Sequence, residues 1–253
     1  MKEISYLQVA LALVLVVIAI VVSRYWKLSV AKDMAIGSVR SFIQLVAVGY
    51  ALQFIFDLES VWLILLAVAV MLTVGAYTAA GRVKKMTRAF PICLAAMIAG
   101  SLVTLAVMLV IDIIPFNARY IIPLGGMIIS NAMNACALTM SRLTTDLYTN
   151  SLAIETSLSL GKSWRVASRE FQRESATAGM MSMLNFMKTV GIVALPGAMT
   201  GMILGGADPM EAVLLQVVVG YMLFAAVTIT SVVSVELTVR RFFTPQHQLR
   251  RSV

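Results

Sequence analysis

The chain alternates long apolar stretches with short polar loops. A membrane-spanning helix needs about 20 mainly apolar residues, and the pattern predicts seven such helices, at 4–23, 38–56, 61–80, 89–111, 120–140, 185–205 and 212–239. The second stretch is short of apolar residues, so we expect its helix to begin near Ala31. Membrane β-strands would alternate in polarity over about 10 residues, and no such alternation occurs. The predicted fold class is therefore all-α, a polytopic transmembrane helical bundle.

The loops indicate a single domain over residues 1–253. Loops 57–60 and 206–210 have the length of tight hairpins, and no low-complexity linker interrupts the chain. One polar segment is much longer than the others. We call residues 141–183 the coupling segment, because it keeps a helical pattern outside the predicted spans.

Positive charge falls in alternate loops. All 20 Lys and Arg residues except Lys2 and Arg119 lie in four regions, namely 24–40, 82–88, 142–188 and 240–251. The intervening loops carry Asp57, Glu59, Asp112, Asp208 and Glu211. Because cytoplasmic loops retain Lys and Arg, the pattern predicts an N-terminus outside, a C-terminus inside and a cytoplasmic coupling segment.

Composition supports a multi-pass protein of the plasma or bacterial inner membrane. The chain is 60% hydrophobic and 13% charged, against about 45–50% and about 25% in soluble domains. The net charge of +8 is then a sign of topology, with the lipid bilayer and its anionic lipids as the expected contact and no nucleic acid. The first apolar run is long enough to span and lacks the features of a cleavable signal peptide.

The sequence of the coupling segment predicts a helix, a glycine turn and a second helix. Gly161 can supply the left-handed turn that ends the first helix, and Ser163 can cap a second helix that begins at Trp164. Trp164, Phe171 and residues between and after them recur on one face, with Lys162, Arg165, Arg169 and Arg173 on another. Two interpretations stay open: a knuckle that docks on a separate ATPase subunit, and an amphipathic helix on the bilayer surface.

Several ordered blocks resemble the FetB-type family of iron-export ABC permeases, which is related to plant half-transporters linked to aluminium tolerance. The blocks are 41–50 (SFIQLVAVGY), 122–133 (IPLGGMIISNAM), 157–161 (SLSLG), 188–199 (KTVGIVALPGAM) and 247–249 (HQL). Glu155 followed by Gly161 also resembles the first half of the coupling loop of ABC permeases. In that loop Thr156 and Ser157 replace two alanines, and the downstream Ile-x-Leu-Pro is absent.

The resemblance implies an ABC permease that exports iron or another metal ion and assembles as a homodimer with two copies of a separate ATPase. The chain has no Gly-x-x-x-x-Gly-Lys-Ser/Thr phosphate loop, so we expect it to bind no cofactor and ATP-Mg to bind the partner. The candidate coupling residues are Glu155, Gly161, Lys162, Trp164, Arg165 and Phe171. The alternatives are an ABC permease for a nucleotide sugar or other solute, and a secondary carrier without an ATPase.

Polar residues inside spans are costly and tend to face a cavity or the bundle interior. Candidate residues of a translocation pathway are Gln44, Met127, Asn131, Asn134, Asn185, Lys188 and Met199. The alternatives are interhelical hydrogen bonds for the amides and snorkelling to the interface for Lys188. Candidate gates or hinges are Pro123, Gly125 and Gly126, which can break the fifth helix, and Pro196 and Gly197, which can kink the sixth.

The metal ligands are unknown from sequence. The chain has one histidine, His247, and no carboxylate at mid-membrane, so a dedicated divalent-metal cage is not visible. The metal would then pass weakly coordinated or chelated. Cys93 and Cys136 lie inside apolar segments, which favours small core residues over a disulfide and leaves a soft-metal role for Cys136 as the alternative.

Overall fold

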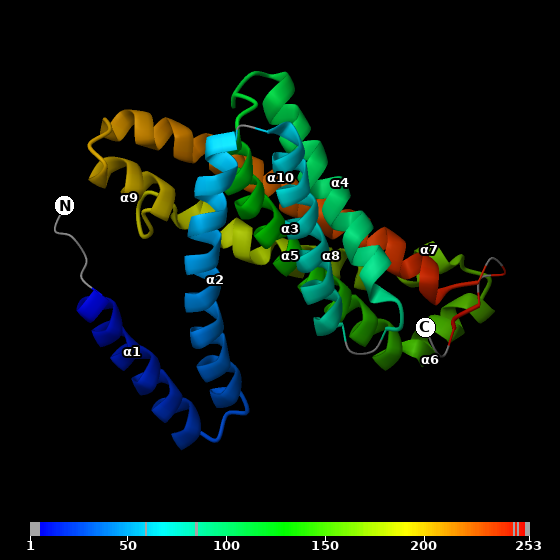
Figure 1. Cartoon of the computed structure of the whole chain (residues 1–253). Coiled ribbons are helices and arrows are strands. Elements are labelled where there is room, and N and C mark those ends of the chain that lie inside the picture. Colours follow the sequence, from blue (N-terminus) through cyan, green and yellow to red (C-terminus); the bar gives the residue numbers. More distant parts are fainter. Residues whose placement is uncertain (1–5, 59, 84–85, 245, 247, 251–253) are drawn as a thin grey trace. The chain divides into compact units, whose positions relative to one another are not determined.

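The computed structural model describes residues 6–58, 60–83, 86–244, 246 and 248–250 (Figure 1). His247 of the last resembling block, Lys84 and Lys85 of the second basic region, and Lys2, Glu59 and Arg251 lie outside them. The described chain is helical from α1 to α10, and its only β-type contacts are two isolated bridges. The predicted all-α class is confirmed.

The chain contacts divide the structure into one unit that ends at Ser60 and a second unit that begins at Val61. The first unit contains α1 (Tyr6–Tyr25) and α2 (Ala31–Leu58). They are joined by a tight turn in which Lys27 has a φ of 52°. The second predicted helix therefore does begin at Ala31, ahead of its apolar stretch.

The second unit is built on four long apolar helices: α3 (Val61–Arg82), α4 (Ala89–Val110), α5 (Ala118–Thr149) and α10 (Pro209–Phe242). Together with α2, they are the five helices long and apolar enough to cross a membrane among the residues described. At 1.5 Å per residue, α5 and α10 are each about 50 Å long, more than the roughly 30 Å of a bilayer core. Both helices therefore extend beyond the hydrocarbon.

The sixth predicted span, 185–205, is wrong as a single helix. α8 (Arg169–Thr189) comes from the polar coupling segment and ends four residues into the predicted span. Gly191 then adopts a φ of 84°, and the backbone turns through a bridge between Val190 and Ala194. A short helix, α9 (Gly197–Leu204), follows. Apolar composition alone predicted a continuous span here, but a left-handed glycine interrupts it.

Two glycines bring the long helices of the second unit close together. A Cβ at Gly179 of α8 would overlap Oγ1 of Thr139 on α5 and lie 2.9 Å from Oγ of Ser231 on α10. A Cβ at Gly100 of α4 would likewise overlap Oγ1 of Thr230 on α10. Small residues allow this close approach of helices in membranes. The hydroxyl-bearing face of α10 thus serves as a packing surface.

The fold contains a separate apolar cluster where α5 and α10 end. We call it the coupling core. Its buried residues are Leu143, Leu147, Ile154, Val235, Val239, Phe242 and Phe243. Tyr148 meets Phe242 edge-on at a centroid distance of 5.2 Å. The coupling segment is therefore anchored to the ends of two spanning helices.

Candidate functional site

A cavity of about 260 Å³ lies among α5, α8, α9 and α10, all within the second unit. Its lining residues are Met127, Asn131, Ser182, Met183, Phe186, Pro196, Gly197, Ala198, Gln216, Val219 and Leu223. Four of the predicted pathway and hinge residues, Met127, Asn131, Pro196 and Gly197, meet here. We call this space the amide cavity, after its two carboxamide side chains.

Asn131 lines the amide cavity with a side chain that is anchored to its own helix. It is placed by α5, four residues after Met127, and its Nδ2 donates a hydrogen bond of 2.8 Å to the carbonyl oxygen of Met127. A carboxamide carries two N–H donors and an acceptor oxygen. One N–H is engaged by the helix backbone, and Oδ1 is the atom that can accept from or coordinate a ligand.

Gln216 is the polar residue that sequence analysis missed. It is only 7% exposed, and its Oε1 has no hydrogen-bond partner among the described residues. Buried polar groups are normally satisfied, so this oxygen is the strongest sign of a ligand position. The signal was present in the sequence, because Gln216 is the one polar side chain in the apolar run 212–219.

A second cavity of about 390 Å³ shares Gln216 with the first. Phe186 also borders both, and Met199 of α9 and Gly191 of the helix break line the second. The predicted pathway residue Met199 therefore lies in this second cavity. The two cavities follow the broken stretch between α8 and α9, where irregular backbone is tolerated because it lines a cavity.

The helix break between α8 and α9 coincides with one of the two predicted hinges, and the structure shows no helix break at the other. Pro196 and Gly197 stand where α9 begins, with Pro196 as its N-cap, so the chain does change direction there. In contrast, α5 runs through Pro123, Gly125 and Gly126 as one helix. The predicted break in the fifth segment is wrong, because α5 continues as one helix through Pro123, although a proline inside a helix removes one backbone hydrogen bond.

The other predicted pathway residues lie away from the amide cavity. Asn134 accepts a hydrogen bond of 3.0 Å from Nη1 of Arg82, the last residue of α3. Asn185 and Lys188 are exposed on α8. Gln44 is exposed on α2 in the first unit. Of the polar candidates, Asn131 alone lines the cavity.

At the other end of α5, the coupling segment forms the predicted helix, turn and helix. α6 (Ser151–Ser159) ends in a turn where Gly161 has a φ of 82°, and α7 (Trp164–Ala167) continues into α8 after a break at Ser168. The glycine turn is confirmed. The helix also begins at Trp164 with Ser163 as N-cap residue, although the serine side chain makes no cap hydrogen bond.

The aromatic face of the segment packs inward. The Trp164 ring stacks on Phe243 at a centroid distance of 5.7 Å and an interplanar angle of 20°. Phe171 also packs on the coupling core. Both rings, which the sequence placed on one face among the candidate coupling residues, are half-buried against the coupling core. The large exposed apolar residues of the coupling segment are Leu152, Leu160, Val166 and Met181.

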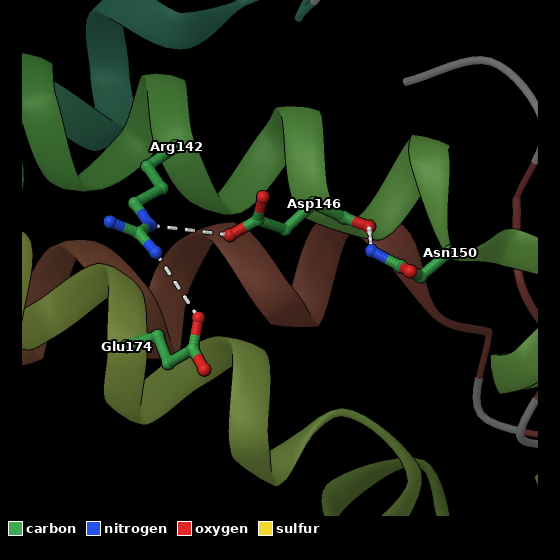
Figure 2. A network of polar contacts seen from close by, with 4 residues as sticks. All are labelled: Arg142, Asp146, Asn150 and Glu174. Atoms are coloured by element: carbon green, nitrogen blue, oxygen red, sulfur yellow. Dashed lines mark hydrogen bonds and ion pairs between the residues drawn. The ribbon is translucent and has the colours of Figure 1, made fainter.

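Ion pairs connect α8 to α5 and α7 to α10, and Figure 2 shows the first of these connections, around Arg142. Arg142 of α5 binds Oε2 of Glu174 on α8 at 3.1 Å and pairs with Asp146, one turn further along α5, at 3.5 Å. Arg165 of α7 lies 3.9 Å from Glu236 of α10. The pair of Arg142 and Glu174 joins residues 32 positions apart in the sequence.

Glu236 and Arg240 form the predicted local pair on α10, at 2.7 Å. Lys162 is exposed in the turn beside Gly161, while Glu155 is half-buried on α6. The described residues include no group of three or more His, Cys, Asp and Glu placed to hold a metal ion. The polar and sulfur-bearing residues that line the amide cavity are therefore neutral.

Comparison with known proteins agrees with this architecture. The model of the uncharacterised protein family UPF0014 matches residues 6–243. Protein ALUMINUM SENSITIVE 3 of Arabidopsis thaliana is 38% identical over 96% of this chain and 89% of its own length. The rice (Oryza sativa subsp. japonica) UPF0014 membrane protein STAR2 is 40% identical over 96% and 85%.

A bacterial relative carries a more explicit name. The probable iron export permease protein FetB of Escherichia coli (strain K12) is 37% identical over 95% of this chain and 93% of its own length. No solved structure matches the chain. The chain therefore belongs to the UPF0014 family and is a multi-pass membrane permease, not an enzyme.

Proposed function

We propose that the chain is the membrane-spanning subunit of an ABC transporter that exports a metal cation from the cytoplasm, with iron as the leading candidate. The observation that carries the proposal is that Gln216, whose buried Oε1 has no hydrogen-bond partner among the described residues, lines the same cavity as Asn131. The name of the Escherichia coli relative, a probable iron export permease, supports the choice of iron.

The cavity chemistry suits a cation that keeps part of its own ligand shell. Two carboxamide side chains and the thioether-bearing Met127 line it, and its lining includes no Lys, Arg, Asp or Glu. At about 30 Å³ per water, 260 Å³ holds an ion with a first shell of water or a small chelator. Neutral oxygens bind such an ion weakly, which favours release over storage.

The two alternatives fit the cavity less well. The phosphates of a nucleotide sugar call for Arg or Lys, which the lining lacks. A secondary carrier calls for an ionisable residue within the membrane. The sequence candidate for that role, Glu236, is instead paired with Arg240 and Arg165 at the end of α10.

The α6–α7 turn is the proposed docking point for the ATPase. Leu160 is 75% exposed next to Gly161 and Lys162, and Leu152 and Val166 expose apolar surface nearby. Arg165 and Glu174 connect this region to α10 and α5 through ion pairs. A force applied to the turn would therefore reach the two helices that carry Asn131 and Gln216. We propose a homodimer of this chain with two ATPase copies.

The test is efflux of radiolabelled iron(II) in inside-out vesicles that contain the chain and the ATPase encoded nearest to it. We expect ATP-dependent uptake of iron into the vesicles. Asn131→Leu should reduce this uptake about tenfold, which corresponds to a loss of about 1.4 kcal/mol of interaction free energy. Asn134→Leu, which removes an amide outside the cavity, is the matched control. Equal uptake in Asn131→Leu and wild type, at equal expression, would reject the cavity as the route.

Recruitment of the ATPase is measured separately by co-purification. Leu160→Asp places a charge on the exposed apolar tip, so we expect it to lose the ATPase. Thr149→Asp, at the exposed end of α5, is the matched control, because it adds the same charge within the coupling segment. Leu138→Asp would not serve, because Leu138 lies further inside α5. Retention of the ATPase by Leu160→Asp would place the docking surface elsewhere.

A further inference from the structure

Three sulfur atoms converge at the interface of α4 and α5, away from the amide cavity. Sγ of Cys93 lies 3.4 Å from Sδ of Met140, and Sγ of Cys136 lies 3.6 Å from the same atom. All three side chains are 0% exposed. Cys136 and Met140 are one turn apart on α5, while Cys93 comes from α4, so the cluster joins two helices.

The spacing is close to that of a soft-metal site. A metal–sulfur bond of about 2.3 Å separates the sulfurs of a trigonal or tetrahedral site by about 3.8–4.0 Å. The observed 3.4 and 3.6 Å require each sulfur to move outward by a few tenths of an ångström. Methionine has three rotatable bonds, so Met140 can make that adjustment without a shift of the helix.

A hydroxyl group contacts Cys136 from a third helix. Oγ of Ser234 on α10 donates a hydrogen bond of 3.3 Å to Sγ of Cys136. Such outer contacts commonly orient metal ligands. A donor aimed at the sulfur is an arrangement that a purely apolar role for the cysteine does not need.

The site lies near the start of α4. Cys93 is four residues after Ala89, the first residue of α4, which places it about 6 Å along the helix. The residues immediately before α4 include Arg88 of the second basic region. The first turn of α4 is therefore the end of that helix from which the sulfurs are closest to the loop.

We propose that Cys93, Cys136 and Met140 bind a single soft monovalent cation, of which Cu⁺ is the natural example. Thiolate and thioether sulfur select Cu⁺ over iron(II) or manganese, which prefer oxygen and nitrogen. On binding, Cys136 releases its proton to solvent, so the Cu⁺–thiolate pair carries no net charge. Met140 contributes a neutral thioether, and Cys93 the third sulfur. The site is independent of the transport function proposed for the amide cavity.

The experiment is a titration of the reduced, full-length chain in detergent with Cu⁺, in competition with a chromogenic Cu⁺ chelator. We expect about one Cu⁺ per chain in the wild type. Met140→Leu keeps the side-chain volume, so the fold should be retained, while the affinity for Cu⁺ should fall at least about tenfold. Met97→Leu, which alters another fully buried methionine, should leave the affinity unchanged.

A second pair of measurements separates a metal site from a packed core. Cys136→Ala should abolish the binding, and Ser234→Ala should weaken it while the thermal unfolding of the metal-free chain changes little. Equal affinities in Met140→Leu, Met97→Leu and wild type would overturn the proposal. So would a thiol assay of the unfolded, unreduced chain that finds Cys93 and Cys136 joined in a disulfide.

Discussion

The amide cavity and the coupling core lie along the same two helices, yet they are built on opposite principles. At the cavity, α8 is interrupted, a buried oxygen has no partner and the lining is uncharged. At the coupling core, aromatic rings interlock and charged side chains pair. Asn131 and Arg142 are eleven residues apart on α5, about 16 Å along one continuous helix.

The contrast teaches where flexibility and rigidity are placed. A binding position keeps an unsatisfied group and an irregular backbone, both of which cost stability. A point of force transfer needs dense packing instead. We therefore expect substitutions at the coupling core to lower stability, and substitutions in the amide cavity to alter transport with little or even favourable effect on stability.

The largest effect is expected at the centre of the coupling core. Phe242 is fully buried, and removal of a buried phenylalanine ring costs about 3–5 kcal/mol. Phe242→Ala should therefore greatly lower the thermal unfolding temperature in detergent. Phe116→Ala, at a well-exposed ring, is the control. A small shift in Phe242→Ala would show that this end is not a packed anchor.

The next effect tests the close approach of α8 to α5 and α10, between the two regions. A side chain at Gly179 meets Thr139 and Ser231, so Gly179→Leu should destabilise the fold by about 1–3 kcal/mol. Gly81→Leu provides the comparison, because a Cβ there meets no atom within 4 Å. Equal unfolding temperatures for the two variants would contradict the packing described for α8.

A change of opposite sign is expected in the amide cavity. Gln216→Leu removes a buried oxygen without a partner, so the chain should gain about 1 kcal/mol in stability. Thermal unfolding of the purified chain measures this gain. A loss of stability similar to that of Phe242→Ala would mean that Gln216 is a structural residue and would remove the contrast between the two regions.

The smallest effect on stability is expected at the ion pairs. Arg142 and Glu174 are both exposed, and exposed pairs contribute about 0–1 kcal/mol. Arg142→Met should therefore leave the unfolding temperature nearly unchanged, yet reduce the stimulation of ATP hydrolysis by the permease. Arg241→Met, at an exposed arginine on α10, is the control. Full stimulation in Arg142→Met would mean that the pair transmits nothing.

Sequence reasoning was sufficient where local rules decide the structure. Apolar length placed five of the seven predicted spanning helices among the described residues, while the described apolar part of the first helix, Leu11–Tyr25, is shorter than a span. The need for a left-handed residue identified the turn at Gly161. The cavity residue Asn131 was found because an amide inside a span is unusual. Gln216 obeys the same rule, so a uniform search for single polar residues in apolar runs would have found it.

The wrong predictions concern a backbone turn and contacts between residues distant in sequence, which a local sequence pattern does not encode. Residues 185–205 are apolar throughout most of their length, and composition does not show that Gly191 reverses the backbone. The inward turn of Trp164 depends on Phe243, 79 positions further along the chain. The pairing of Arg142 with Glu174 and the approach of Cys93 to Met140 likewise join residues distant in sequence.

The central claim is that Gln216 faces the transported ion, and iron(II) efflux tests it most directly. The comparison uses inside-out vesicles with equal amounts of wild type, Gln216→Leu and Leu214→Val, each shown to bind the ATPase; Leu214 is an exposed residue of α10. The account predicts ATP-dependent iron(II) uptake reduced about tenfold in Gln216→Leu and unchanged in Leu214→Val. Wild-type uptake in Gln216→Leu would contradict it.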